Sequence, residues 1–381
     1  MSNYKYDYLI VGAGLAGSTL AYLLNQADFK VKVIDKRNVI AGNCYTEEKD
    51  GIDIHVYGPH IFHTSNEEVW EFVNHFTRFN NFINTPMAIA PDGNIYNMPF
   101  NMNTFSKIWS DVTTPNEAMI KIQEEINKAG INYISNLEEY AINTVGTTIY
   151  NLLVKGYTEK QWGKPCIMLS PDIIKRLPLR FTYDNNYFND KYQGIPKYGY
   201  TNMIQNMLKG IELELGVDYI ENREVLEQEA RYIIYTGRID EYYNYEFGKL
   251  EYRSLRFVTM KHEISNYQGN AVINYTGNDP KYTRIIEHKH FNPDKISNCT
   301  YITYEFPSKT GDPFYPLSDK DNIELYQKYK NKSDEDDKVI FAGRLGKYKY
   351  FDMDDVIEDC LKMANDIIYK RMEEDYIERI K

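Results

Sequence analysis

The sequence is poor in cysteine, lacks long apolar runs and carries fewer positive than negative charges. Its four cysteines are far apart and form no Cys-x-x-Cys pair, so we expect four free thiols in a reducing compartment. No apolar run approaches the roughly 20 residues that a membrane-spanning helix needs. The apolar core of a signal peptide is also missing before the first predicted strand. These absences favour a cytoplasmic protein that is not inserted in a membrane.

The charge balance excludes a further class of partner. Lysine and arginine number 44 against 55 aspartates and glutamates, which gives a net charge of −11. Such a chain offers no broad basic surface, so no nucleic-acid partner is expected. A phosphorylated ligand would require a few arginines to gather in one cleft. Tyrosine is abundant, at 35 of 381 residues, and it suits sugar and uracil recognition, although β-rich structure alone explains most single tyrosines.

Three glycines near the start of the chain predict a dinucleotide-binding unit. Gly12, Gly14 and Gly17 stand between a β-branched run at 6–11 and a helical pattern, and a second apolar run ends at Asp35. Gly12 permits the tight turn, Gly14 lets the backbone approach a pyrophosphate, and Gly17 lets the helix pack on the strand. The helix start binds the pyrophosphate, and Asp35 accepts from a ribose hydroxyl. The alternative is a glycine-rich turn that binds no ligand.

A second glycine element bears on which dinucleotide is bound. Gly42-Asn43 follows shortly after the acidic residue. This arrangement resembles the FAD-binding signature of the glutathione-reductase and amine-oxidase class, in which the extra turn runs beside the rest of the cofactor. An NAD-dependent dehydrogenase would not need such a turn. The sequence therefore favours FAD, with NAD as the alternative.

The rest of the chain alternates between helical and strand-rich stretches. From Thr104 to about Lys160 the apolar spacing is helical, and one helix is expected to begin at Thr114-Pro115 and to end at Gly130. Strands are expected near 231–237, 271–275, 300–306 and 338–342, and a last helix over 354–370. The predicted class is α/β (α+β, multidomain), with a Rossmann-like FAD-binding domain, a helical insertion and an antiparallel-sheet substrate domain.

The domains are expected to be discontinuous in sequence. Residues 1–80, 205–245 and 330–381 form the FAD-binding domain. Residues 100–165 form a helical domain that carries the start of a mobile lid. The antiparallel-sheet substrate domain takes residues 82–100, 166–204 and 246–329.

Four separated segments together resemble the bacterial UDP-galactopyranose mutases. They are Gly58-Pro59-His60-Ile61-Phe62-His63, Gly156-Tyr157-Thr158-Glu159-Lys160-Gln161-Trp162-Gly163, Tyr282-Thr283-Arg284-Ile285-Ile286-Glu287-His288 and Gly343-Arg344-Leu345-Gly346-Lys347-Tyr348-Lys349-Tyr350-Phe351-Asp352-Met353. The segments are in order and span nearly the whole chain. The second and fourth are the most specific, especially in combination.

This resemblance implies an activity and a cofactor. Members of the family interconvert UDP-galactopyranose and UDP-galactofuranose with no net redox change and use reduced FAD. The flavin N5 attacks the anomeric carbon and displaces UDP, and the ring reopens and closes as the other isomer. The resemblance further implies a homodimer whose product enters cell-surface polysaccharide biosynthesis.

The resemblance also assigns site residues in this chain. The catalytic set would be Arg176, Arg284, Tyr350 and His60. Further substrate-binding residues would be Asn84, Tyr157, Trp162, Tyr187, Asn274 and Tyr315. The FAD-binding set would be Gly12, Gly14, Leu15, Gly17, Asp35, Lys36, Gly42, Asn43, His60, Ile61, Gly343, Arg344, Tyr350, Asp352 and Met353. Residues 165–175 would form the mobile lid, with Arg176 at its end, and both arginines would hold the diphosphate.

Some positions depart from the family pattern, and other functions stay open. Leu153 stands where an aromatic residue is frequent, Ala342 where a second glycine is common, and Arg238 where proline is usual. Leu153 leaves the packing of the uracil and the sugar preference open. A flavin amine oxidase and a non-catalytic nucleotide-sugar-binding protein are the alternatives. The histidine pairs His60/His63 and His288/His290 lack converging cysteines or carboxylates, so no metal is expected.

Overall fold

Five parallel strands form the sheet that contains the N-terminal glycine unit. The structure, a computed structural model, describes residues 4–175, 177–317 and 319–380. The strands are β1 (Tyr6–Val11), β2 (Val31–Asp35), β9 (Glu212–Leu215), β10 (Ala230–Tyr235) and β16 (Val339–Phe341), in the order β16-β10-β1-β2-β9. Every neighbouring pair is parallel. Since both ends and the middle of the chain supply strands, this sheet forms only when distant segments meet.

Helices cover both faces of the parallel sheet. Successive residues of a strand point to opposite faces, so Tyr8 and Ile10 pack on one side and Leu9 on the other. The first side is covered by α1 (Leu15–Gln26), α2 (Glu67–Phe76), α7 (Gly199–Met207) and α12 (Met353–Ile380). The second is covered by α8 (Tyr219–Glu229), α9 (Ile239–Tyr242) and α10 (Lys320–Asp334). This two-sided cover explains the largely apolar character of β1, β10 and β16.

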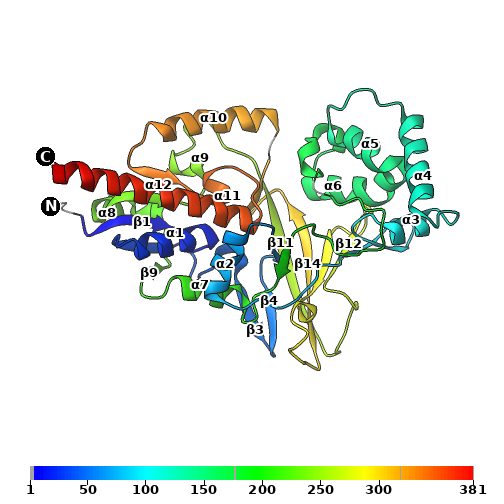
Figure 1. The fold of residues 1–381 in the computed structure, drawn as a ribbon, viewed down its shortest axis with the longest axis horizontal. Helices are drawn as coiled ribbons and strands as arrows, with labels where there is room; N and C mark the ends of the chain where they lie inside the picture. Colours follow the sequence, from blue (N-terminus) through cyan, green and yellow to red (C-terminus); the bar gives the residue numbers. More distant parts are fainter. Residues whose placement is uncertain (1–3, 176, 318, 381) are drawn as a thin grey trace.

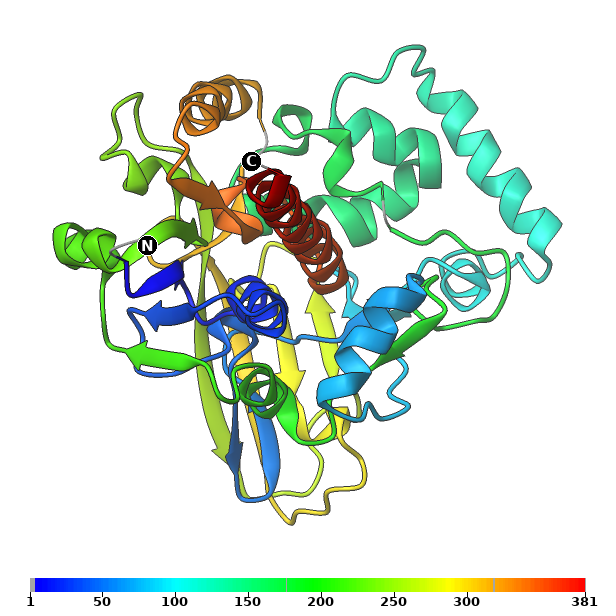
Figure 2. The ribbon, with the colours of Figure 1, turned by 60° about the vertical axis from the view of Figure 1, so that its left-hand side comes forward.

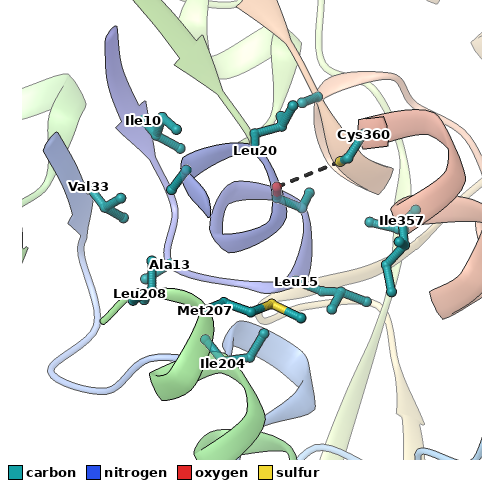
Figure 3. Close-up of a cluster of buried hydrophobic side chains, with 14 of the residues drawn as sticks. Ile10, Ala13, Leu15, Leu20, Val33, Ile204, Met207, Leu208, Ile357 and Cys360 are labelled. Carbon is teal, nitrogen blue, oxygen red and sulfur yellow. Dashed lines mark hydrogen bonds between the residues drawn. The ribbon is translucent and has the colours of Figure 1, made fainter. Parts of the chain in front are cut away.

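The core on the first side joins the two ends of the chain. Figure 3 shows Leu20 of α1 among side chains from the strands, from α7 and from α12. The Cys360 thiol of α12 donates to the Ala16 carbonyl of α1 at 3.6 Å. Each fully buried large apolar side chain contributes about 1.5–3 kcal/mol to folding. The C-terminal helix is therefore an integral part of the N-terminal glycine unit.

A second sheet of seven strands adjoins the first (Figure 1). Its order is β15-β11-β14-β13-β12-β6-β7, and only the pair β6–β12 is parallel. The strands are β6 (Met87–Ile89), β7 (Ile95–Asn97), β11 (Tyr252–His262), β12 (Val272–Tyr275), β13 (Arg284–Glu287), β14 (Thr300–Ser308) and β15 (Pro313–Pro316). Two small sheets pair β3 (Thr46–Lys49) with β4 (Ile52–His55) and β5 (Phe62–Thr64) with β8 (Tyr192–Gly194).

Helices from the middle of the chain form a separate group beyond the second sheet (Figures 1 and 2). They are α3 (Met102–Ile108), α4 (Pro115–Ala129), α5 (Leu137–Ile149) and α6 (Lys155–Trp162), with a π-helical turn at Tyr150–Val154. Thr114 and Glu117 form a capping box at the start of α4, and Gly130 ends it at φ +63°. Short helices complete the chain: Gly42–Cys44, Cys166–Met168, Pro171–Ile173, His288–Phe291 and α11 (Gly343–Gly346).

The predicted fold class is confirmed, with differences in detail. The bounds of α4 are those expected, whereas the last helix continues to Ile380, beyond the expected 354–370. Strands β9 and β11 were not anticipated, because β9 reads Glu-Leu-Glu-Leu and β11 mixes charges with apolar residues. The domain limits stay a prediction, and α7 shares the core of α1.

Candidate active site

The glycine loop after β1 is packed so tightly that side chains cannot enter it. A Cβ atom on Gly17 would lie 1.9 Å from the Gly12 carbonyl oxygen. Gly12 itself has φ +110°, and a Cβ there would lie 2.0 Å from Thr236 Oγ1. Both distances are far inside van der Waals contact, so only glycine fits. The loop therefore approaches α1 and β10 as closely as a dinucleotide-binding turn requires.

The start of α1 is open to an anion. Gly14 is the N-cap residue, no side-chain hydrogen bond to it occurs among the described residues, and the first turn carries no acidic side chain. A helix start without a capping side chain presents backbone N–H groups and the positive end of its dipole. Gly42 faces Gly14, since a Cβ on Gly42 would lie 3.0 Å from Gly14 Cα. The two predicted glycine elements thus meet at one place and leave backbone exposed there.

Asp35, at the end of β2, fixes this loop. Its Oδ2 accepts the Ala13 N–H and its Oδ1 accepts the Arg37 N–H, both at 2.8 Å. A carboxylate accepts about four hydrogen bonds, so these two leave capacity for a ribose hydroxyl. Arg37, which was not anticipated, extends between Asn43 Oδ1 at 3.3 Å and Asp312 Oδ2 at 3.1 Å. Asp35 therefore has a structural role that the sequence alone did not indicate.

A long pocket runs from the glycine loop toward the second sheet. The predicted residues that line it are Gly12, Gly14, Leu15, Gly17, Asp35, Lys36, Gly42, Asn43, His60, Gly343, Arg344, Asp352 and Met353. Ile61 and Tyr350 are not among its lining residues. Segments that were not predicted also line it, namely 217–220, 236–238 and 311–314. Segments 217–220 and 236–238 follow the carboxyl ends of the parallel strands β9 and β10, and ligands of such sheets bind at these ends. A correct prediction of β9 would therefore have indicated segment 217–220.

An aromatic cluster with one arginine lies next to this pocket. The rings of Tyr315 and Tyr350 stack with centroids 5.6 Å apart at 15°, and the Trp162 ring lies 6.2 Å from that of Tyr315. The Arg344 guanidinium lies 5.5 Å from the centre of Tyr315 and 5.0 Å from that of Tyr350. Its Nη1 donates to the Phe314 carbonyl at 3.1 Å. Arg344 thus connects the pocket to residues predicted to contact the substrate.

Arg284 is held in a charged state by a buried carboxylate. Its Nε donates to Glu305 Oε2 at 2.8 Å, and the Glu305 side chain is fully buried. Burial opposes the charge of Arg284, but the negative charge of Glu305 raises the pKa of the guanidinium well above its usual range. Because the bond to Glu305 uses Nε, the two terminal nitrogens of Arg284 have donors left for an anion.

Several other residues that were predicted to bind the substrate lie near Arg284, and the charge of Arg284 affects the pKa of two of them. Burial raises the pKa of Tyr157 to about 12, with the positive charge of Arg284 opposing and nearby Tyr187 adding to the rise. Burial also raises the pKa of Tyr315. Asn274 pairs directly with Arg284 across β12 and β13, so both side chains leave the same face of the sheet. These groups come from a helix, a loop and three strands, yet lie around one charged arginine.

His60 is neutral at physiological pH. Burial, together with the positive charges of Arg344 and Arg284, lowers its pKa to about 4, although the hydrogen bond to the Gly58 carbonyl opposes this shift. His60 Nδ1 lies 2.8 Å from that carbonyl oxygen. A carbonyl only accepts, so Nδ1 carries the proton and Nε2 presents a lone pair. His60 therefore offers an acceptor, not a positive charge, to the pocket.

Asn84 and Tyr187 belong to the same wall of the site. The Asn84 carbonyl accepts the Tyr187 N–H at 2.8 Å, and the Asn84 N–H donates to Gln193 Oε1 at 3.1 Å. Arg176, the second predicted diphosphate ligand, lies outside the described residues.

Within the described ranges no three histidine, cysteine or acidic side chains gather as metal ligands. No helix of the described chain is long and apolar enough to cross a bilayer.

Comparison with known proteins gives a consistent result. Residues 152–350 match the family model for UDP-galactopyranose mutase, and residues 10–76 match that for an NAD(P)-binding Rossmann-like domain. The chain is 40% identical to dTDP-fucopyranose mutase of Escherichia coli, over 93% of this chain and 97% of that one. It is 38% identical to a probable UDP-galactopyranose mutase of Klebsiella pneumoniae, over 95% and 94%.

A solved structure has the same fold. A crystal structure of reduced UDP-galactopyranose mutase superposes with a TM-score of 0.73, covering 95% of this chain and 94% of that one at 12% identity. At this identity the likeness concerns the fold alone. It extends over the parallel sheet, the second sheet and the helical group together.

Proposed function

Because the chain belongs to the UDP-galactopyranose mutase family and is an isomerase, we propose that it interconverts UDP-galactopyranose and UDP-galactofuranose with no net redox change. The observation that supports this most strongly is the position of a permanently charged arginine, Arg284, among tyrosines beside a dinucleotide pocket. An amine oxidase would need an apolar or acidic cage for a cationic substrate, and a cation beside Arg284 would be repelled. The site suits an anionic substrate.

The residues around Arg284 take separate roles in this proposal. Arg284 binds the diphosphate through its terminal nitrogens and stabilises UDP while it is detached from the sugar. Arg176 is the second diphosphate ligand and closes with residues 165–175 over the site. Tyr157 and Trp162 hold the uridine. Asn84, Tyr187, Asn274, Tyr315 and Tyr350 complete the sugar side of the pocket.

The dinucleotide pocket fits FAD. Gly14 and Gly42 bring no side chains to the start of α1, so a pyrophosphate would approach the backbone N–H groups there, and Asp35 has capacity for a ribose hydroxyl. When bound, reduced FAD would supply the nucleophile that attacks the anomeric carbon. His60 offers a neutral acceptor and Arg344 a fixed positive charge at the junction of the two pockets. A lid that excludes water would protect the sugar from hydrolysis while it is between the pyranose form and the furanose form.

A second substrate class is favoured by one specific observation. Of the two relatives described above, the one with the higher identity is a dTDP-fucopyranose mutase. Leu153 bears on this choice, because it is buried in the helical group one turn before Tyr157. The two candidate substrates differ by a methyl group on the base, by the 2′-hydroxyl of the pentose and by the 6-hydroxyl of the hexose. The reaction, the cofactor and the diphosphate contacts would be the same.

One experiment tests both candidates. The purified protein, loaded with FAD and reduced with dithionite, is incubated in parallel with UDP-galactofuranose and dTDP-fucofuranose, and kcat/KM is measured for each. The proposal expects the uridine substrate to be preferred and oxidised protein to be inactive. A preference for the deoxy sugar would assign the second function, and equal turnover by oxidised protein would contradict both.

We further propose a homodimer in the cytoplasm, which light scattering and fractionation would test.

A further inference from the structure

Lys160 occupies a cage of backbone carbonyl groups between α6 and the second sheet. Its Nζ donates to the carbonyls of Tyr275 at 2.9 Å, Gly277 at 2.8 Å and Pro280 at 2.9 Å. Tyr275 is the last residue of β12, and Gly277 and Pro280 lie in the turn that joins β12 to β13. An ammonium group has three N–H donors, so each donor has one carbonyl partner. The side chain therefore ties a helix to a turn, and none of the three bonds is to a carboxylate.

The same helix approaches this turn too closely for any side chain at Gly156. A Cβ on Gly156 would lie 2.3 Å from the Thr276 carbonyl oxygen. Thr276 is 2% exposed, and its Oγ1 donates to the Leu152 carbonyl at 2.8 Å. The turn thus contacts α6 through a close backbone approach and the ammonium cage, and it contacts the π-helical turn that leads into α6 through a hydroxyl bond. Three independent features fix the distance between the two elements.

The two elements joined in this way carry opposite walls of the substrate site. Tyr157 and Trp162 flank Lys160 on α6. Asn274 precedes the turn on β12, and Arg284 follows it on β13. A shift of α6 relative to the turn would therefore change the separation between the uridine-side aromatics and the diphosphate arginine. Such a shift is costly, because misplacement of about 1 Å reduces activity by as much as 100-fold in enzymes.

The charge state of Lys160 at neutral pH suits this role. Burial lowers the pKa of the ammonium to about 8, with the positive charge of Lys281 adding to this effect and Asp279 opposing it. Lys160 is consequently charged, with three donors, at pH 7. A neutral or shorter side chain would leave carbonyls of a partly buried turn without partners, which costs free energy.

From this geometry we infer that Lys160 is a positioning residue, which sets the distance between the uridine-binding helix α6 and the strands that carry Asn274 and Arg284. The inference deepens the proposed function and rests on it. Lys160 touches neither substrate nor cofactor in this account. It acts through Tyr157 and Trp162, so its loss is expected to weaken UDP binding and raise KM before it affects kcat.

The test compares Lys160→Met with two further variants in the full-length, FAD-loaded protein. Gly156→Ala keeps the lysine but forces α6 away from Thr276. Lys155→Met is the matched control, because Lys155 lies on the same helix but its Nζ approaches Glu138 of α5 at 3.8 Å. UDP affinity is measured by calorimetry, and KM and kcat by turnover, each per bound flavin. Melting temperature reports stability separately.

We expect Lys160→Met and Gly156→Ala to weaken UDP binding about tenfold, while Lys155→Met binds as wild type does. In a Tyr157→Ala background, Lys160→Met should cause little further loss, since both changes affect the same contact. Wild-type UDP affinity in Lys160→Met or, if that variant does not fold, in Gly156→Ala would overturn the inference. A fall in melting temperature with unchanged affinity per flavin would do the same. If wild-type protein fails to bind UDP, the proposed function fails instead.

Discussion

Removal of the Arg284 side chain is expected to have two separable consequences. The first is loss of the diphosphate ligand, so turnover should disappear while FAD stays bound, because Arg284 does not line the dinucleotide pocket. The second concerns Glu305, whose fully buried carboxylate accepts Arg284 Nε at 2.8 Å. Arg284→Ala leaves that charge without its cation. The variant therefore tests function and stability at the same time.

The size of the stability effect follows from the burial of the pair. Arg284 is 21% exposed at its side chain and Glu305 is not exposed at all. Breaking a buried pair by removing one partner costs about 3–5 kcal/mol, most of it from the uncompensated charge. The Thr283 hydroxyl lies 3.4 Å from Glu305 Oε1 and compensates only weakly. We expect Arg284→Ala to destabilise the protein by about 3 kcal/mol, the lower end of this range, because the arginine is partly exposed.

A double variant separates the two consequences. Arg284→Ala with Glu305→Gln removes the uncompensated charge, so much of the lost stability should return in urea unfolding. Turnover per bound flavin should stay absent, and Arg284→Lys should recover only a small part, because an ammonium lacks the planar fork of a guanidinium. Near-normal turnover per flavin in Arg284→Ala would refute the assignment of this residue to the diphosphate. Recovery of activity in the double variant would show that Arg284 serves only to neutralise Glu305.

Three further predictions concern the cofactor, the base and acid stability. Gly17→Ala places a Cβ 1.9 Å from the Gly12 carbonyl oxygen, so the purified variant should have lost FAD absorbance, whereas Gly93→Ala, at an open turn, should retain it. Tyr157→Ala should weaken UDP binding in calorimetry by about 1–3 kcal/mol, the value of one base stacked on an aromatic ring, and unchanged affinity would contradict this placement. Burial opposes the charge of Glu287, but bonds from His290 and from backbone N–H groups lower its pKa to about 2, below the ordinary 4.5. Its stabilising contribution should therefore be complete above pH 4.5 and lost as the pH falls toward 2, so Glu287→Gln should flatten that part of the pH–stability curve.

The sequence allowed the local features of this fold to be predicted well. The glycine unit, the helix start at Thr114-Pro115 and the stop at Gly130 are recognisable because each depends on a few neighbouring residues. Strand β9 was missed because its glutamates are exposed at the edge of the sheet, where no apolar pattern is required. The lining residues after β9 and near Gly311 were missed for a different reason, since they reach the pocket only through long-range packing.

The chemistry of the site was less accessible from the sequence. No spacing rule indicates that Glu305 pairs with Arg284, because the two meet only through the register of β13 and β14. The roles of Asp35 in fixing the glycine loop and of Lys160 in the carbonyl cage likewise depend on contacts between distant segments. Sequence resemblance proposes the residues that would contact ligands, whereas the structure shows which residues hold them in place.

The central claim, an isomerisation without net redox change, is tested most directly by counting turnovers per reducing equivalent. FAD-loaded protein is reduced anaerobically with one equivalent of dithionite, freed of excess reductant and given UDP-galactofuranose, and the pyranose is quantified while flavin absorbance is followed. The account predicts many turnovers per flavin, with the flavin still reduced at the end and no nicotinamide or oxygen required. Product limited to one equivalent per flavin, with the flavin oxidised in step, would contradict it.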